Sequence, residues 1–149
     1  LYVGEPVLST TDFNPGAFRW VNAGDRDHST LSFLRLDPKG ENVYLVIGNF
    51  TPVTRTLCRV GVPEAGRWSE VLNSNASVYG GAGFGNYGGQ ATEAVVADGQ
   101  AQSLVLTLPG LSTLVLKWNR TDALAAVKTS ESKLAGKPVR SARRTKKVA

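Results

Sequence analysis

Three neighbouring residues, Asp25, His28 and Ser29, have the side-chain types of a hydrolase triad. In such a triad the histidine takes the proton of the serine nucleophile and the aspartate orients the imidazole ring. Triads bring these residues together from separate elements and hold the nucleophile on a rigid turn. Here all three lie in one short stretch, so we interpret them as a polar loop.

A second pattern, Gly83, Gly85 and Gly88, formally matches the G-x-G-x-x-G motif of dinucleotide-binding sites. That motif works between a strand and the start of a helix, where backbone N–H groups and the helix dipole meet the phosphates. The residues after Gly89 have the composition of a strand, and no helical pattern follows them. We therefore reject a nucleotide site.

Carboxylates and metal ligands offer no further reaction chemistry. The acidic residues before position 121 are scattered, mostly over turns, and no two form the acid pair that glycoside hydrolysis needs. Glu70 lies two residues from Trp68, on the same face of a strand, which fits a sugar contact or a structural hydrogen bond. One cysteine and one histidine cannot build a Cys/His metal site. We predict no catalytic residue, no metal and no cofactor.

The elements that surround these residues have the pattern of short strands. Residues 102–108 place Leu104, Leu106 and Leu108 on one face, and residues 111–118 repeat this alternation, as half-buried antiparallel strands do. Further strand-like runs, each bounded by turn residues, cover 30–36, 42–50, 54–62 and 67–72. The spacing predicts an all-β fold, an antiparallel β-sandwich of about seven or eight strands.

Charge and composition divide the chain into three parts. Residues 1–17 are predicted to be a linker and residues 18–120 the sandwich domain. Residues 1–120 carry nine basic and ten acidic side chains, whereas residues 121–149 carry eight and two. The net charge of +5 therefore belongs to a basic tail, residues 121–149, which we expect to be disordered. We favour a solvated tail over a nucleic-acid-binding arm, because the tail has no aromatic residues.

The compartment and the extent of the chain follow from what the sequence lacks. No run of residues is long and apolar enough for a membrane span. Cys58 is expected to be a buried structural thiol, which fits the reduced cytoplasm. The chain begins at Leu1 and contains no methionine, so we expect it to be a fragment of a longer protein.

Two segments resemble a known family. Residues 49–53 read NFTPV, and residues 66–86 read GRWSEVLNSNASVYGGAGFGN. The latter is similar to the pattern G-x-W-x-E-x-L-N-[ST]-[DN]-x-x-x-Y-G-G-[SA]-x-x-G-N of bacterial glycogen (1,4-α-glucan) branching enzymes. Residues 103–117, SLVLTLPGLSTLVLK, resemble the end of the same enzymes, and the likeness extends over residues 6–118. Ser9, Thr10 and Gly110 depart from the family pattern, and the tail has no counterpart in it.

The resemblance implies a non-catalytic domain. Branching enzymes of the α-amylase superfamily cut an α-1,4-glucan and transfer the chain to a 6-hydroxyl. Their catalytic carboxylates lie in a TIM barrel that precedes the C-terminal β domain. The partner implied for this chain is therefore that barrel, which its sequence does not include, and the β domain is expected to pack against it.

The resemblance also implies surface contact with α-glucan. Aromatic faces would stack on sugar rings, and amides would bond to hydroxyl groups. The candidate residues are Trp68, Tyr79, Phe84, Tyr87, Asn73, Asn75 and Asn86. For most of them packing is the competing interpretation, with Trp68 in the core and the glycines supplying positive φ angles. The alternative functions are a free-standing carbohydrate-binding module and the C-terminal domain of another α-glucan-acting amylase relative.

Overall fold

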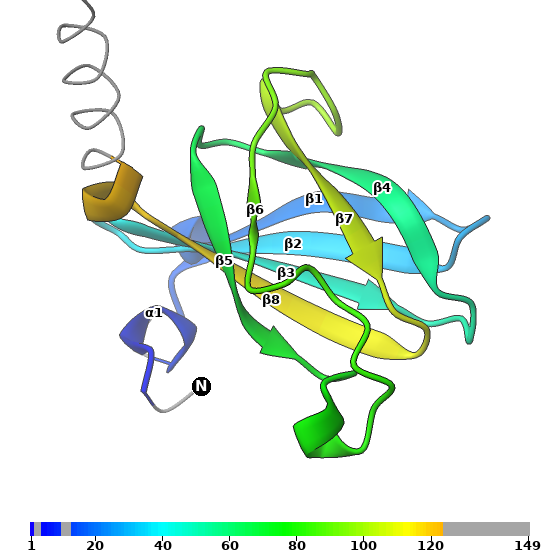
Figure 1. Cartoon of the computed structure of the whole chain (residues 1–149). Helices are drawn as coiled ribbons and strands as arrows, with labels where there is room; N and C mark the ends of the chain where they lie inside the picture. Colours follow the sequence, from blue (N-terminus) through cyan, green and yellow to red (C-terminus); the bar gives the residue numbers. More distant parts are fainter. Residues whose placement is uncertain (2–3, 10–12, 124–149) are drawn as a thin grey trace, which may run out of the picture.

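Eight strands form two facing antiparallel sheets in the computed structural model, which describes residues 1, 4–9 and 13–123 (Figure 1). The larger sheet has the order β1-β2-β3-β8-β5-β6, and β4 pairs with β7 in the smaller one. This confirms the predicted all-β sandwich. The strands are β1 (Phe18–Asp25), β2 (Thr30–Leu36), β3 (Asn42–Asn49), β4 (Arg55–Val62), β5 (Arg67–Asn73), β6 (Gln90–Ala91), β7 (Gln102–Leu108) and β8 (Ser112–Asn119).

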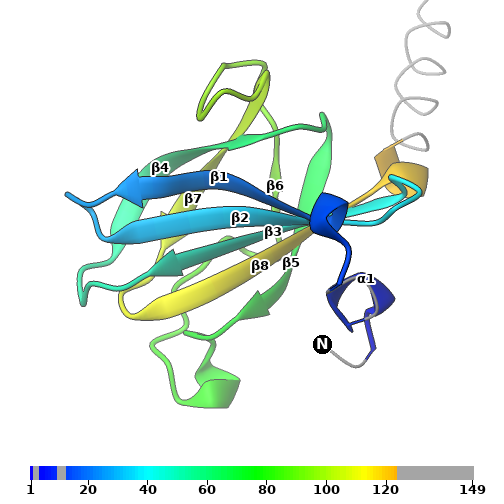
Figure 2. The same ribbon diagram turned by 180° about the vertical axis from the view of Figure 1, so that it is seen from behind.

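Each predicted strand matches an observed one to within one residue at either end. β1 and the two-residue β6 complete the larger sheet at its edges. In Figure 2, which views the molecule from behind, β1, β2, β3, β8 and β5 follow one another across the sheet. The first three strands of the sheet, β1 to β3, are therefore consecutive in the sequence. The last strand, β8, lies beside β3.

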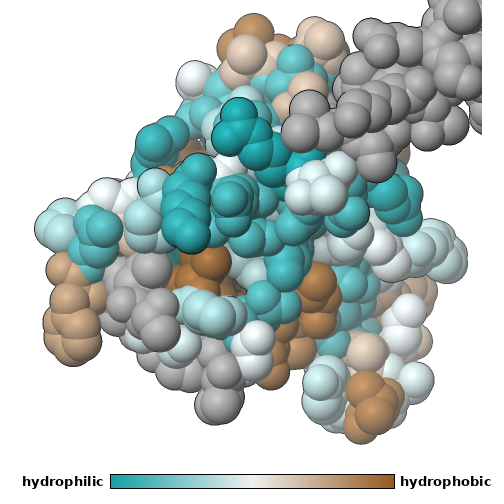
Figure 3. Space-filling model, turned by 90° about the vertical axis from the view of Figure 1, so that its left-hand side faces the viewer, coloured by the Kyte–Doolittle hydropathy of each residue, from teal (hydrophilic) through white to brown (hydrophobic). Residues whose placement is uncertain are grey.

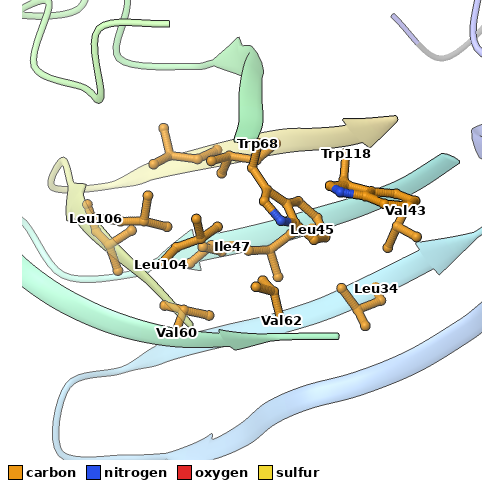
Figure 4. Packing of buried hydrophobic residues seen from close by; sticks show 13 residues of the cluster. Leu34, Val43, Leu45, Ile47, Val60, Val62, Trp68, Leu104, Leu106 and Trp118 are labelled. Carbon is orange, nitrogen blue, oxygen red and sulfur yellow. The ribbon is translucent and has the colours of Figure 1, made fainter. Parts of the chain in front are cut away.

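The core lies between the two sheets. Leu104, Leu106 and Leu108 of β7 are buried there, as the alternation predicted, and so are the inward-facing residues of β3 and β8 (Figure 4). Both tryptophans of the core also donate a hydrogen bond. Trp68 Nε1 lies 3.1 Å from the Glu64 carbonyl oxygen, and Trp118 Nε1 lies 3.0 Å from that of Ala65. The indoles thereby fill the core and fix the β4–β5 turn.

The N-terminal segment packs on the outer face of the larger sheet. Helix α1 (Pro6–Ser9) places Val7 and Leu8 against Tyr44 and Val115. The predicted irregular linker thus contains a helical turn, and a 3₁₀ turn, η1 (Pro15–Ala17), follows it. The turn at η1 is capped by the side chain of Asn14, whose Oδ1 accepts a hydrogen bond from the Gly16 N–H at 2.9 Å.

Glu5 fastens this segment to the sheet. Its carboxylate accepts a hydrogen bond from the Tyr44 hydroxyl and lies 3.0 Å from Lys117 Nζ. The Tyr44 hydrogen bond, followed by Lys117, lowers the pKa of Glu5 even though partial burial opposes the shift. An ionised Glu5 therefore binds more strongly than a protonated one.

The structure describes only the first residues of the predicted tail. From residue 124 onward the predicted basic tail lies outside the described residues. Within the part of the chain that the structure describes, the helices are too short or too polar to cross a membrane.

We predict that Glu5→Gln destabilises the fold by about 1–2 kcal/mol at pH 7, because it weakens two hydrogen bonds to a charged acceptor. Since the folded pKa is lowered, the loss should be full above the ordinary value of 4.5 and should shrink as the pH falls through the folded pKa. Urea unfolding followed by circular dichroism at several pH values measures it. Glu41→Gln, which changes an exposed carboxylate, is the control; the same pH dependence in both variants would contradict the assignment.

Candidate functional site

The loop of residues 74–89, called here the glycine-rich loop, displays aromatic side chains to solvent. It runs from β5 to β6, contains the 3₁₀ turn η2 (Ser77–Tyr79), and projects beyond the end of the sandwich (Figure 1). Tyr79 and Phe84 are 64% and 56% exposed, and Tyr87 is 100% exposed. Exposed aromatic rings close together in sequence on one loop are unusual unless they meet a partner.

Two predicted site residues, Asn73 and Asn75, hold the backbone of the loop. Asn73 Nδ2 donates to the Phe84 carbonyl oxygen at 2.8 Å, and Asn75 Oδ1 accepts from the Phe84 N–H at 3.2 Å. Both backbone groups of Phe84 are thus fixed while its ring remains exposed. These amide groups position the aromatic residue, and the contact of Asn73 and Asn75 with sugar hydroxyl groups stays a prediction.

Asn86 ties the loop to both sheets. Its side chain is buried and makes two hydrogen bonds with the backbone of Thr107 in β7, donating from Nδ2 at 3.1 Å and accepting at Oδ1 at 2.8 Å. Nδ2 also donates to Glu70 of β5 at 2.9 Å. Glu70 further accepts from the Asn86 N–H at 3.1 Å and from Asn73 Nδ2 at 3.3 Å. Sequence reasoning left open whether Glu70 contacts sugar or bonds internally, and the structure shows the internal bonds.

Close backbone contacts explain why the loop needs glycine. A Cβ atom at Gly81 would lie 2.1 Å from the Asn75 carbonyl oxygen, and one at Gly89 would lie 2.2 Å from that of Trp68. Gly89 also has a φ of +131°, a conformation that side chains rarely adopt. Tyr87 has a φ of 51°, in the left-handed region that is uncommon for a bulky residue. The loop therefore holds a fully exposed tyrosine at a conformational cost.

Trp68 must be removed from the candidate ligand contacts. Its side chain is fully buried in the core and its indole N–H is already bonded to Glu64. The ring has no accessible face to offer to a sugar, and the competing interpretation of Trp68 as a core residue is confirmed. The glycine-rich loop thus retains three exposed aromatic candidates, Tyr79, Phe84 and Tyr87.

The residues with triad chemistry form a polar turn, as predicted. His28 Nδ1 lies 2.8 Å from Asp25 Oδ1, and the Thr30 hydroxyl donates to Oδ2 of Asp25 at 2.9 Å. Burial raises the pKa of Asp25, but the hydrogen bonds from Thr30 and His28 outweigh it and hold the pKa below its usual value. Among the described residues, no three His, Cys, Asp or Glu side chains gather as metal ligands.

A second aromatic group was missed by sequence reasoning. Phe18 and Trp20 of β1 and Phe33 of β2 pack together with ring centroids 5.0 to 5.8 Å apart. Trp20 pairs with Phe33, whereas the next residue, Leu34, faces the core. The group therefore lies on the outer face of the larger sheet, where Trp20 remains 53% exposed. The two-residue spacing of Phe18 and Trp20 places both rings on one face of a strand, which the sequence could have shown. That Phe33 joins them follows only from the register of β1 on β2.

Comparison with known proteins gives a consistent result. The family described as "Alpha amylase, C-terminal all-beta domain" matches residues 20–119. The 1,4-alpha-glucan branching enzyme of Aromatoleum aromaticum is 51% identical over 116 residues, 78% of this chain and 18% of the relative. Those of Pseudomonas fluorescens and Aquifex aeolicus are 50% and 46% identical over 117 residues, again 78% of this chain and 16% and 19% of the relatives. The chain thus spans less than a fifth of the length of these curated relatives.

We predict that Asn86→Ala destabilises the protein by about 2–4 kcal/mol, since it leaves the Thr107 N–H and carbonyl oxygen without their side-chain partner and removes one of the hydrogen bonds to Glu70. Urea unfolding followed by circular dichroism gives the loss. Ser77→Ala, at an exposed position of the same loop, is the matched control and should change stability by less than about 0.5 kcal/mol. Equal stabilities of the two variants would show that Asn86 does not anchor the loop.

Proposed function

Because the chain belongs to the alpha-amylase C-terminal all-beta domain family, we propose that it is the non-catalytic β-sandwich domain of a 1,4-α-glucan branching enzyme. The observation that carries this proposal is the identity of 46–51% to three branching enzymes over 116 or 117 residues each. The domain then serves glycogen synthesis, in which α-1,4-glucan chains are transferred to form α-1,6 branches, without supplying a catalytic group.

The partner in this proposal is a catalytic TIM barrel of the same polypeptide. The relatives are more than five times as long as the segment that they share with this chain, which leaves ample length for a catalytic domain. The outer face of the larger sheet offers a surface for it. Val7 and Leu8 already cover part of that face, and the rings of Phe18 and Trp20 lie exposed on it.

The end of the sandwich near α1 has a mixed surface. Figure 3 shows this end, where hydrophobic side chains form separate groups among hydrophilic ones. Contacts between domains of one chain typically have this mixed character. The domain is thus suited to support a barrel through apolar contacts on the sheet and polar contacts around them.

Glucan contact is assigned to Tyr79, Phe84 and Tyr87 of the glycine-rich loop. Their rings are exposed and their backbone is braced by Asn73, Asn75 and Asn86, so little freedom is lost when a sugar stacks on them. Cys58 is half-buried, not fully buried as expected, and this partial burial raises the pKa of its thiol, which makes it poorly reactive. A cytoplasmic location fits this unpaired thiol.

We predict that the purified chain has no branching activity. Amylose incubated with it should keep its iodine-stained absorbance, because the catalytic carboxylates belong to the absent barrel. A fall in absorbance that follows the chain through purification would refute the assignment of the chemistry to another domain.

We also predict that the chain migrates more slowly through a native gel that contains glycogen. Changing Tyr79, Phe84 and Tyr87 together to alanine should weaken this binding by about tenfold or more, since each ring contributes of the order of 1 kcal/mol. Trp20→Ala removes an exposed ring outside the loop and is the control. If Trp20→Ala abolishes the slower migration and the triple variant keeps it, glucan binds on the outer face of the larger sheet and not on the glycine-rich loop.

Binding strength separates the two functional classes. A free-standing carbohydrate-binding module would bind glycogen tightly and need no other domain. A supporting domain with an accessory contact should bind weakly by itself, so micromolar affinity of the isolated chain would favour the module.

A further inference from the structure

The space between the sheets changes from apolar to polar at one end, where β4 begins. In β4, Arg55 pairs with Leu108 and Cys58 pairs with Leu106 of β7. Directly opposed residues of an antiparallel pair point to the same face. Because both leucines belong to the core, the Arg55 side chain also faces the inside of the sandwich.

The facing wall, on β1 and β2, is polar in the same region. Ser32 pairs with Ile47, a core residue, so Ser32 and its alternate neighbour Thr30 face inward. Asn22 pairs with Ser32, and Asp25 pairs with Thr30, which places both on the same wall. Polar side chains from two sheets therefore converge on one inner volume.

A cavity of about 470 Å³ occupies this volume. Ile47, Val60 and Leu108 give it an apolar floor, and the polar residues just named line its sides together with Asp98. Its size lies within the roughly 300–1,000 Å³ of small-molecule sites. A bulge in β4 helps to shape the wall, because Leu57 adopts a φ of 57° and turns outward, 81% exposed.

The charged side chains that line the cavity differ in whether they have hydrogen-bond partners. Asp25 is bonded to His28 and Thr30, and Asp98 accepts from Asn22 Nδ2 at 3.1 Å and from the Gly61 N–H at 2.9 Å. Arg55 Nε, in contrast, is shielded from solvent and has no hydrogen-bond partner within the described residues. A shielded guanidinium N–H without an acceptor costs free energy unless a bound molecule supplies one.

We propose that this cavity, called here the inter-sheet cavity, binds a neutral, hydroxyl-rich ligand the size of one or two sugar rings. Hydroxyl groups can accept from the Arg55 guanidinium and donate to the carboxylates of Asp25 and Asp98 at the same time. The second arginine of the lining, Arg59, is already paired with Glu93 and Ser103. An anion would therefore gain Arg55 but approach the carboxylates of Asp25 and Asp98, whereas a cation would gain the carboxylates but approach Arg55. The apolar floor suits the C–H face of a sugar. The inter-sheet cavity shares no residue with the glycine-rich loop, and ligand binding there does not depend on the proposed function.

Titration of the ¹⁵N-labelled chain with maltose, followed by NMR, tests the proposal. We expect saturable shifts of the amides in β1, β2 and β4 around the cavity. Arg55→Met removes the guanidinium but keeps the length of the side chain, and should weaken maltose binding by about tenfold or more. Arg67→Met, at an exposed arginine outside the cavity, is the matched control and should bind as the unchanged chain does.

A second cavity variant keeps the proposal testable if Arg55→Met does not fold. Thr56→Trp adds bulk at an exposed position that lines the cavity, and should abolish the shifts while the rest of the spectrum is kept. The proposal is overturned if no saturable shift occurs up to about 100 mM maltose, or if inorganic phosphate produces the same shifts. It is also overturned if binding survives both cavity variants but is lost in the Tyr79, Phe84 and Tyr87 triple variant, which would assign all saccharide binding to the glycine-rich loop.

Discussion

Two buried asparagine side chains tie the sheets together near the end of β7. Asn49 of β3 donates from Nδ2 to the carbonyl oxygens of Leu108 and Pro109 at 3.3 and 3.0 Å, and its Oδ1 accepts from the Thr51 N–H at 3.1 Å. Asn86 links β5, through Glu70, to the Thr107 backbone. Buried backbone groups need partners, and these two amides provide them where the regular pairing of strands ends.

This arrangement separates the rigid frame of the domain from its exposed aromatic side chains. The glycine-rich loop is long and projects from the sandwich, yet Asn86 fixes it at its base and Asn73 fixes it near Phe84. A braced loop can present rings to a partner with a small entropic cost. This arrangement fits the proposed role beside a catalytic domain.

The fold was largely predictable because its strands are strongly patterned. Leu104, Leu106 and Leu108 alternate with residues of the other face, so their burial followed from sequence alone. The helical turn at Pro6–Ser9 was not predicted, since four residues carry no periodic signal and its formation depends on packing against Tyr44.

The candidate site was predictable only in part. The location of the glycine-rich loop and the exposure of three of its aromatic residues fit the sequence, but the tasks of its asparagines depend on contacts across 9 to 21 positions of the chain. The type and spacing of Trp68 allowed two roles, a sugar contact or a core residue. The packing of the two sheets buries its side chain, which makes it a core residue. The inter-sheet cavity depends on the register of β4 on β7 and on the bulge at Leu57, neither of which a single sequence specifies.

Exchange of the domain between enzymes tests the central claim most directly. In the branching enzyme of Aquifex aeolicus, the segment similar to this chain, 46% identical over 117 residues, would be replaced by the corresponding part of this chain. The account predicts that the folded chimera lowers the iodine-stained absorbance of amylose, whereas the enzyme without the segment does not. A chimera that folds cooperatively and shows no branching would contradict the assignment of this chain as a branching-enzyme domain.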